Sequence, residues 1–223
     1  MNPRLLLVDD HALVRSGIRL LLDESSAVTV VGEFGSARAA LEMCEQLKPD
    51  VVLTDVEMPQ LNGIELARQI TSTYPAVSVI MVTMHSSQQY VLESLRAGAL
   101  GYVLKDSAIS ELLTAIKSVG AGKRYLSPAL VDFVLTDYVR QANGEQTASE
   151  LNKLSPRERE VLQLLAEGGT SAQIRDVLHI SVRTADAHRS KIMQKLDIHS
   201  IAGLTKFAIT HGLTSVHYRP NRA

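Results

Sequence analysis

The chain has 223 residues, 45% of them hydrophobic, and this length suits two domains of ordinary size better than one. It contains a single cysteine, Cys44, which excludes a disulfide-stabilised scaffold and a zinc site built from several cysteines. No run of about 18 apolar residues is present, and residues 1–4 lead directly into a strand-like run. We therefore expect no signal peptide, no membrane partner and a cytoplasmic location.

Charge is distributed unevenly along the chain. Residues 151–223 hold 11 Lys and Arg against 6 Asp and Glu, a net charge of +5, whereas residues 1–150 hold 12 against 18, or −6. A basic half suits a polyanionic partner, and an acidic half suits a cation site or simple solubility. Charge alone does not decide between these roles.

The first half alternates short runs rich in branched residues with amphipathic segments. The amphipathic segments, such as residues 13–22 and 92–97, predict helices. Alternation of this kind implies parallel strands joined by right-handed crossovers, with helices on both faces of the sheet. We therefore expect an α/β domain over residues 1–123 with a doubly wound, five-stranded parallel sheet. The five predicted strands are Leu5–Val8, Val28–Val31, Val51–Leu53, Val77–Val82 and Tyr102–Leu104.

The second half, residues 151–215, has no comparable branched run, and its apolar residues recur every three or four positions, as in an all-helical domain. The run Ser155 to Glu158 predicts a capping box with proline at the first helical position, and Gly168-Gly169 predicts the end of that helix. Thr170 and Ser181 predict the starts of two more helices. The resulting pattern is helix, turn, helix.

Two segments lie outside these domains. Residues 124–150 are expected to form a linker that includes a helix, because a polar stretch over residues 141–150 separates the two patterned halves. Residues 216–223 are expected to form a mobile tail.

Polar side chains follow four of the predicted strands, where a parallel sheet places its ligands. Carboxylates held close together repel one another unless a cation compensates, and Mg²⁺ prefers such oxygen ligands. A lysine and a hydroxyl beside them could stabilise a transferred phosphoryl group, with an aspartate as nucleophile. An alternative for Asp10 is that it caps the helix starting at Ala12. The residues are Asp9, Asp10, Asp55, Thr83 and Lys105.

Residues 3–123 resemble the receiver domain of response regulators, which implies a flavodoxin-like fold. The resemblance implies that Asp55 accepts the phosphoryl group, and that Asp9, Asp10 and Asp55, with the backbone carbonyl of Glu57, bind Mg²⁺. Thr83 and Lys105 would contact the phosphoryl oxygens, and Tyr102 would be an aromatic switch that turns inward when Thr83 moves. The motifs that carry the resemblance are Val8-Asp9-Asp10, Thr54 to Pro59 with Asn62-Gly63, Val82-Thr83, and Gly101 to Lys105.

The helix predicted after Ser181 has the two faces that a DNA-recognition helix needs. Its expected inward face holds Ala185, His188, Ile192 and Leu196. Short outward side chains permit close approach to bases, whereas basic ones suit phosphates, and Asp186 could accept from cytosine or repel phosphate. A solvated basic face is the alternative. The expected DNA contacts are Arg183, Asp186, Ala187, Ser190, Lys191, Gln194 and Lys195.

Residues 152–213 resemble the LuxR-type helix-turn-helix in the runs Leu154 to Leu162, Ile180 to Thr184 and His188 to Ile192. One departure is Asp197, which stands where glycine is frequent. Together the two resemblances place the chain with the NarL/FixJ class of two-component regulators. They imply that a histidine kinase phosphorylates Asp55 and that a homodimer then binds double-stranded DNA to control transcription.

Two rival functions remain. A hydrolase of the haloacid dehalogenase kind also uses a nucleophilic aspartate and Mg²⁺, but it would want a second aspartate at position 57, where Glu57 stands. A receiver-like interaction module that works without phosphate would not need the intact set of acidic, hydroxyl and lysine residues. We expect no turnover of an external substrate, so the chain is not predicted to be an ordinary enzyme.

Overall fold

The computed structural model describes residues 2–132, 134–136 and 150–214. The chain forms two compact units that divide between residues 145 and 146. Among the residues that the structure describes, no helix has both the length and the apolar character needed to cross a membrane.

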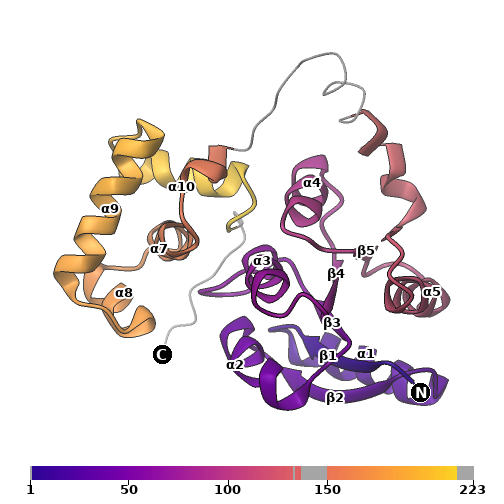
Figure 1. The fold of residues 1–223 in the computed structure, drawn as a ribbon. Coiled ribbons are helices and arrows are strands. Elements are labelled where there is room, and N and C mark those ends of the chain that lie inside the picture. The colour runs from indigo at the N-terminus through magenta and orange to yellow at the C-terminus, as the bar shows by residue number, and fades with distance from the viewer. Residues whose placement is uncertain (1, 133, 137–149, 215–223) are drawn as a thin grey trace. The chain divides into compact units, whose positions relative to one another are not determined.

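The first unit is a parallel sheet flanked by helices (Figure 1). Its strand order is β2-β1-β3-β4-β5-β6, and every neighbouring pair is parallel. This arrangement confirms the predicted doubly wound α/β fold. The strands are β1 (Arg4–Val8), β2 (Thr29–Phe34), β3 (Val51–Thr54), β4 (Ser78–Thr83), β5 (Gly101–Leu104) and β6 (Tyr125–Leu126).

Side chains of successive strand residues enter two separate cores. Leu6 and Val8 of β1 pack with residues of α2, α3 and α4, whereas Leu5 and Leu7 pack with residues of α1 and α5. This alternation follows from the two-residue period of a strand. The helices are α1 (Ala12–Ser25), α2 (Ala37–Leu47), α3 (Gly63–Thr73), α4 (Gln88–Arg96) and α5 (Ile109–Gly120).

The sheet has one strand more than the five that the sequence predicted. Strand β6 is only two residues long, and Tyr125 and Ser127 donate backbone hydrogen bonds to Leu100 and Tyr102 beside it. A strand this short shows no periodicity in a sequence, which is why the segment was assigned to the linker. A short 3-10 turn (Pro128–Leu130) and helical residues 131, 132 and 134–136 follow it. Most of the polar linker and the predicted tail lie outside the described residues.

Helix α1 is less deeply buried than its apolar spacing predicted. Leu22 is fully buried and Ile18 partly so, but Leu13 is 88% exposed and Leu20 and Leu21 also face solvent. The apolar residues of this helix therefore cover more than one face, and only the part around Leu22 belongs to the core.

The second unit is helical, with its own core of buried residues. After a 3-10 turn (Glu150–Lys153) come α7 (Pro156–Ala166), α8 (Ser171–Leu178), α9 (Val182–Leu196) and α10 (Ile201–Thr210). The expected capping box joins Ser155 and Glu158, and a second one joins Thr170 and Gln173 at the helix start that Thr170 predicted. The predicted helix-turn-helix is confirmed.

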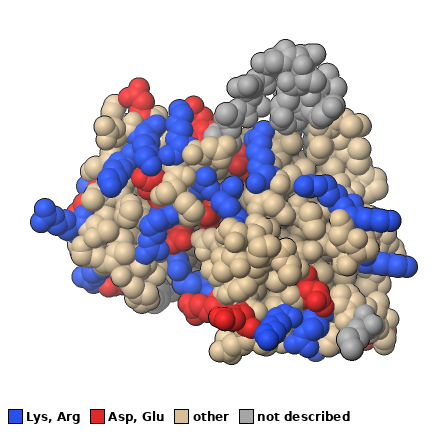
Figure 2. Space-filling model, viewed as in Figure 1, with Lys and Arg blue, Asp and Glu red and all other residues tan. Residues whose placement is uncertain are grey.

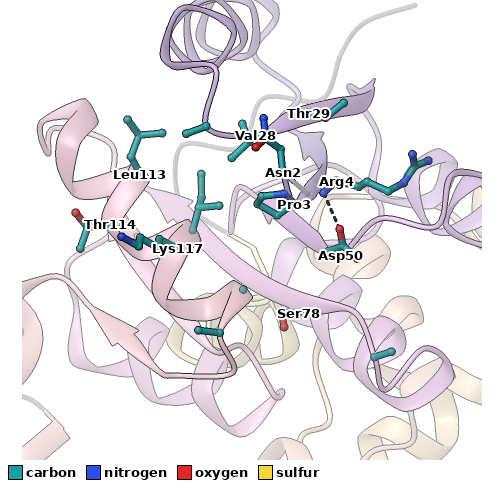
Figure 3. Close-up of a pocket in the computed structure, with 15 residues that line it drawn as sticks. Asn2, Pro3, Arg4, Val28, Thr29, Asp50, Ser78, Leu113, Thr114 and Lys117 are labelled. Atoms are coloured by element: carbon teal, nitrogen blue, oxygen red, sulfur yellow. Dashed lines mark hydrogen bonds between the residues drawn. The ribbon is translucent and has the colours of Figure 1, made fainter.

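A cleft opens at the amino ends of the strands (Figure 3). Arg4 and Ser78 line it at the starts of β1 and β4, and Lys117 comes from α5. Asp50 also lines the cleft and accepts a 2.7 Å hydrogen bond from the backbone nitrogen of Arg4 (Figure 3). The polar residues predicted to form the site follow the opposite ends of the strands.

Candidate functional site

Parallel pairing of the strands brings the predicted acidic residues together. Asp9 follows β1 and Asp55 follows β3, and both are buried, while Asp10 keeps 28% of its side chain exposed. The backbone nitrogen of Asp55 donates to the carbonyl of Val8, which fixes the two strand ends side by side. One oxygen from each carboxylate and one ring nitrogen of His11 lie within 4.8 Å of one another.

The predicted Asn62-Gly63 pair shapes the loop after Asp55. The Asn62 side chain accepts a 2.8 Å hydrogen bond from the backbone nitrogen of Glu65 and so caps α3. A Cβ atom at position 63 would lie 1.8 Å from the carbonyl oxygen of Asp55. Only glycine permits this close approach, so the pair holds the start of α3 against the residue after β3.

Lys105 joins two of the carboxylates. Its Nζ lies 2.6 Å from Oδ2 of Asp55 and 2.7 Å from Oδ2 of Asp9, and 10% of its side chain is exposed. Burial alone would lower the pKa of Lys105, but the charges of and hydrogen bonds to Asp55 and Asp9 outweigh burial and raise it above its ordinary value. The ammonium therefore stays protonated and supplies a fixed positive charge at the site.

The carboxylate cluster still carries excess negative charge at Asp10. Burial is the largest cause that raises the pKa of Asp10, the charges of Asp9 and Asp55 raise it further, and His11 opposes them. A bound cation would relieve this repulsion. The donors are hard oxygens, which are the ligands that Mg²⁺ prefers, so the residues present fit that ion.

Asp10 does not cap α1. The residue before the helix is His11, which makes no side-chain cap, and the backbone nitrogen of His11 donates instead to Oδ1 of Asp9 at 2.8 Å. Nδ1 of His11 lies 2.9 Å from Oδ1 of Asp10. The capping alternative is therefore not supported, and the Asp10 side chain stays in the cluster.

Thr83 and Tyr102 lie next to this cluster in the fold and are fully buried. Thr83 ends β4, and Tyr102 lies on the adjacent strand β5. The Tyr102 hydroxyl donates a 2.7 Å hydrogen bond to the backbone carbonyl of His85. Burial raises the pKa of Tyr102 above its ordinary value, so the hydroxyl keeps its proton and acts as a donor. The aromatic ring thus occupies the inward position.

The side chain of Glu57 does not take the place of a second catalytic aspartate. Its Oε1 lies 3.0 Å from Nε2 of His85 and accepts a 3.4 Å hydrogen bond from the Tyr90 hydroxyl. The carboxylate is therefore engaged by the segment after β4. This geometry gives no support to the hydrolase alternative.

Helix α9 presents the two faces that its sequence predicted. Ala185, Ile192 and Leu196 are buried and His188 is half-buried, as expected for the inward face. The side chains of the helical unit visible in Figure 2 include many Lys and Arg with several acidic residues among them. Six of the seven predicted DNA contacts are exposed: Arg183, Ala187, Ser190, Lys191, Gln194 and Lys195.

Two of the residues predicted to contact DNA, Asp186 and Lys195, also contact other helices of the helical unit. Oδ1 of Asp186 accepts a 2.8 Å hydrogen bond from the Ser171 hydroxyl and lies 3.4 Å from Arg189. Nζ of Lys195 lies 2.7 Å from Oε2 of Glu158 in the capping box of α7. Asp186 therefore joins α8 to α9, and Lys195 joins α9 to α7.

The sequence matches two families of known proteins. Residues 5–117 match the family described as response regulator receiver domain, and residues 152–208 match the one described as bacterial regulatory proteins, luxR family. The chain is a response regulator. With its LuxR-type DNA-binding domain it is a transcriptional regulator of a two-component system.

Curated relatives align over almost the whole response regulator. It is 36% identical to the transcriptional regulatory protein MctR of Rhizobium johnstonii over 212 residues, 95% of each chain. It is also 36% identical to the response regulator UvrY of Escherichia coli over 208 residues, 93% of this chain and 94% of UvrY. Among solved structures, an RcsB–DNA complex is 28% identical and has a TM-score of 0.58, covering 95% of this chain and 99% of that one.

Three site residues of this response regulator were missed from the sequence. His11 stands directly after Asp10, and this position could have marked it as a member of the cluster. His85 and Tyr90 stack with ring centroids 4.5 Å apart, but they come from a loop and the helix after it. Their contact with Glu57 depends on the fold, and no spacing in the sequence signals it.

Proposed function

We propose that Asp55 is the phosphoacceptor of this response regulator and that a histidine kinase is the donor. An oxygen of Asp55 attacks the phosphorus of a phosphohistidine, the P–N bond breaks, and the departing imidazole takes up a proton. The observation that carries this proposal is the ammonium of Lys105, held 2.6 Å from the Asp55 carboxylate beside two further acidic residues. Its positive charge can stabilise the oxygens of the incoming phosphoryl group.

Asp9, Asp10 and Asp55, with the backbone carbonyl of Glu57, would hold Mg²⁺. When bound there, the ion neutralises negative charge on the phosphoryl group. The Thr83 hydroxyl would donate to a phosphoryl oxygen, and Tyr102 would retain its inward position while that contact lasts. These roles follow from the proximity of the residues and from the family to which the chain belongs.

We propose that α9 enters the major groove of double-stranded DNA and that two copies of the chain bind together, in the cytoplasm where the DNA lies. The short exposed side chains of Ala187 and Ser190 allow close approach to base edges, and Arg183, Lys191 and Gln194 are free to reach further. A related protein, RcsB, has been solved as two dimers bound to two parallel DNAs. Asp186 and Lys195 would contact DNA and would also hold α9 in place through their contacts with α8 and α7.

The phosphoacceptor is tested by incubating the full chain with acetyl phosphate and Mg²⁺ and measuring intact mass. The parent should gain one acid-labile phosphoryl group, and Asp55→Asn should gain none. Asp106→Asn is a matched control, because Asp106 is an exposed carboxylate directly after Lys105. Equal phosphorylation of Asp55→Asn and the parent would exclude Asp55 as the acceptor.

A further inference from the structure

The loop between β4 and α4 is held by side chains from three other elements. His85, two residues after Thr83, lies at the centre of these contacts. Its imidazole stacks on Tyr90 of α4, with ring centroids 4.5 Å apart and an interplanar angle of 28°. Nε2 of the same ring lies 3.0 Å from Oε1 of Glu57, which belongs to the loop after β3. A third element, β5, reaches the His85 backbone through Tyr102.

The contacts of His85 are mutually supporting. Tyr90 donates its hydroxyl proton to the same Glu57 oxygen that faces His85, at 3.4 Å. The backbone nitrogen of His85 donates to Oγ1 of Thr83 at 3.4 Å. The imidazole and the carboxylate are 29% and 31% exposed, so each contact alone is partly screened by solvent. Together these contacts restrict both the imidazole ring and the backbone of His85, and therefore the loop that carries it.

The inward position of Tyr102 depends on this loop, because the loop supplies the acceptor for the Tyr102 hydroxyl. Tyr102 is fully buried, and the carbonyl of His85 accepts its hydroxyl proton at 2.7 Å. A buried hydroxyl that loses its acceptor is destabilised, so movement of the His85 carbonyl would favour an outward ring. The switch residue therefore depends on a neighbour that is not a member of the carboxylate cluster.

We propose that Glu57, His85 and Tyr90 form a clamp that holds the β4–α4 loop and thereby keeps Tyr102 inward. His85 is a positioning residue in this arrangement, because it acts through Tyr102. The inference rests on the proposed function in that it assigns Tyr102 the role of switch. Phosphorylation would act on the same equilibrium through Thr83, whereas the clamp acts through the His85 side chain.

The clamp is tested by ¹⁹F NMR of the full chain labelled with 3-fluorotyrosine. The chain has 6 tyrosines, and a Tyr102→Phe variant assigns the resonance of interest. His85→Ala keeps the backbone carbonyl that accepts from Tyr102 but removes both side-chain contacts. We expect it to raise the population of the outward ring about fivefold, as the loss of a partly exposed imidazole–carboxylate contact and a stacking contact implies. Addition of beryllofluoride with Mg²⁺, a phosphoryl analogue, should restore the inward resonance.

Two further variants separate the parts of the clamp. Glu57→Gln keeps the size of the side chain and the backbone carbonyl but removes the charge, and Tyr90→Phe keeps the stacked ring but removes the hydroxyl. The outward population should rise most in His85→Ala, less in Glu57→Gln and least in Tyr90→Phe. Combining Glu57→Gln with His85→Ala should add little to His85→Ala alone, because the two residues contact each other.

Controls distinguish a clamp from general loss of structure. Glu42→Gln removes an exposed carboxylate on α2 and should leave the Tyr102 resonance unchanged. Tyr125 on β6 is an internal reference, because partial unfolding would move its resonance together with that of Tyr102. If folded His85→Ala and Glu57→Gln both leave Tyr102 inward, the clamp does not exist. If the parent takes up no beryllofluoride, the proposed phosphoacceptor fails, and the comparison in the unmodified chain still tests the clamp.

Discussion

At the scale of single residues, the acidic cluster combines the protonated amine of Lys105 with a carboxylate, Asp10, whose pKa is raised. Lys105 balances part of the charge on Asp9 and Asp55, while Asp10 has a raised pKa, mainly through burial. The cluster is therefore organised to accept a further positive charge near Asp10. Removing a carboxylate and removing the ammonium should have opposite effects on the binding of Mg²⁺.

Replacing Asp10 with asparagine should abolish measurable Mg²⁺ binding and slow phosphorylation by acetyl phosphate at least about a hundredfold, because two carboxylates hold the ion poorly. Folding should be retained, since the Asp10 side chain is partly exposed and caps no helix. Isothermal titration calorimetry and the time course of phosphorylation measure the two effects. Asp132→Asn, at another exposed aspartate, should match the parent. Phosphorylation of Asp10→Asn at the parental rate would contradict the assigned site.

Replacing Lys105 with alanine should strengthen Mg²⁺ binding about tenfold, because the ammonium competes for oxygens of Asp9 and Asp55. The same variant should accept a phosphoryl group more slowly than the parent, since the charge that stabilises the transferred oxygens is lost. Calorimetry at fixed ionic strength and intact mass follow the two properties. Weaker Mg²⁺ binding in Lys105→Ala would show that the lysine supports the ion instead of competing with it.

At the scale of elements, α9 contains basic residues with two different roles. Lys191 is exposed, whereas Lys195 is paired with Glu158 of α7. Lys191→Ala should weaken binding to all DNA sequences alike and reduce the salt slope by about 1. Lys195→Ala should also lower the stability of the helical unit. Fluorescence anisotropy over a range of salt concentrations, together with chemical unfolding, separates these effects.

Substitutions at Ala187 and Ser190 are the matched contrast, because these short exposed residues should read bases and not phosphates. They should alter sequence preference with little change in the salt slope. A sequence-selective loss of affinity in Lys191→Ala, with an unchanged slope, would refute this division of the helix.

The capping box of α7 should make the stability of the helical unit depend on pH. Burial would raise the pKa of Glu158, but hydrogen bonds from Lys195 and Ser155 outweigh it and leave the pKa below its ordinary value. The stabilisation is therefore present above the ordinary carboxyl pKa and is lost as pH falls through the folded-state value. Glutamine can still complete the box, so Glu158→Gln should cost at most about 1 kcal/mol near neutral pH, through the charge lost beside Lys195 and the helix N-terminus.

Chemical unfolding at about pH 7 and about pH 4 measures this dependence, and Glu158→Gln should lose less stability than the parent between the two. Glu167→Gln is the control, because it removes the charge of a half-buried carboxylate at the other end of the same helix. If Glu158→Gln and the parent show the same loss, the capping carboxylate does not carry the effect.

The elements were predictable from the sequence to the extent that each has a local cause. The strand ends at Asp9 and Asp55 and the capping residues of α7 and α8 follow from periodicity and cap chemistry, and the structure has them in place. Asp197, noted as a departure from glycine, has a φ of 55°, the left-handed conformation in which glycine is favoured.

Contacts between distant segments were not predictable in this way. The ion pair of Lys195 with Glu158 and the stack of His85 on Tyr90 depend on how helices and loops pack, and neither leaves a spacing signal. Strand β6 was missed for a related reason, because two residues cannot show a period and only their pairing with β5 defines them. The least predictable features are therefore those that connect elements.

At the scale of the whole molecule, two units of opposite charge share one chain. Residues 1–150 carry a net charge of −6 and residues 151–223 carry +5. Each unit has its own core, so each can fold around its own apolar residues. Attraction between the units would compete with the attraction of the basic unit for DNA, and the competition should depend on the state of Asp55.

We therefore expect the unphosphorylated receiver unit to cover the outward face of α9 and to lower its affinity for DNA. Phosphorylation of Asp55 draws in Thr83 and Lys105, and we expect this rearrangement of the receiver unit to free α9 and promote dimerisation. A difference of a few kcal/mol between the two states suffices for such a population shift.

The measurement compares DNA affinity and sedimentation for the full chain, its phosphorylated form and a fragment that begins at residue 149. The full unmodified chain should bind most weakly, and phosphorylation should bring it close to the fragment or beyond. Asp55→Asn is the control that acetyl phosphate should leave unchanged. If the unmodified chain already binds as tightly as the fragment, and phosphorylation changes neither affinity nor dimerisation, the receiver unit does not mask the DNA-binding helix.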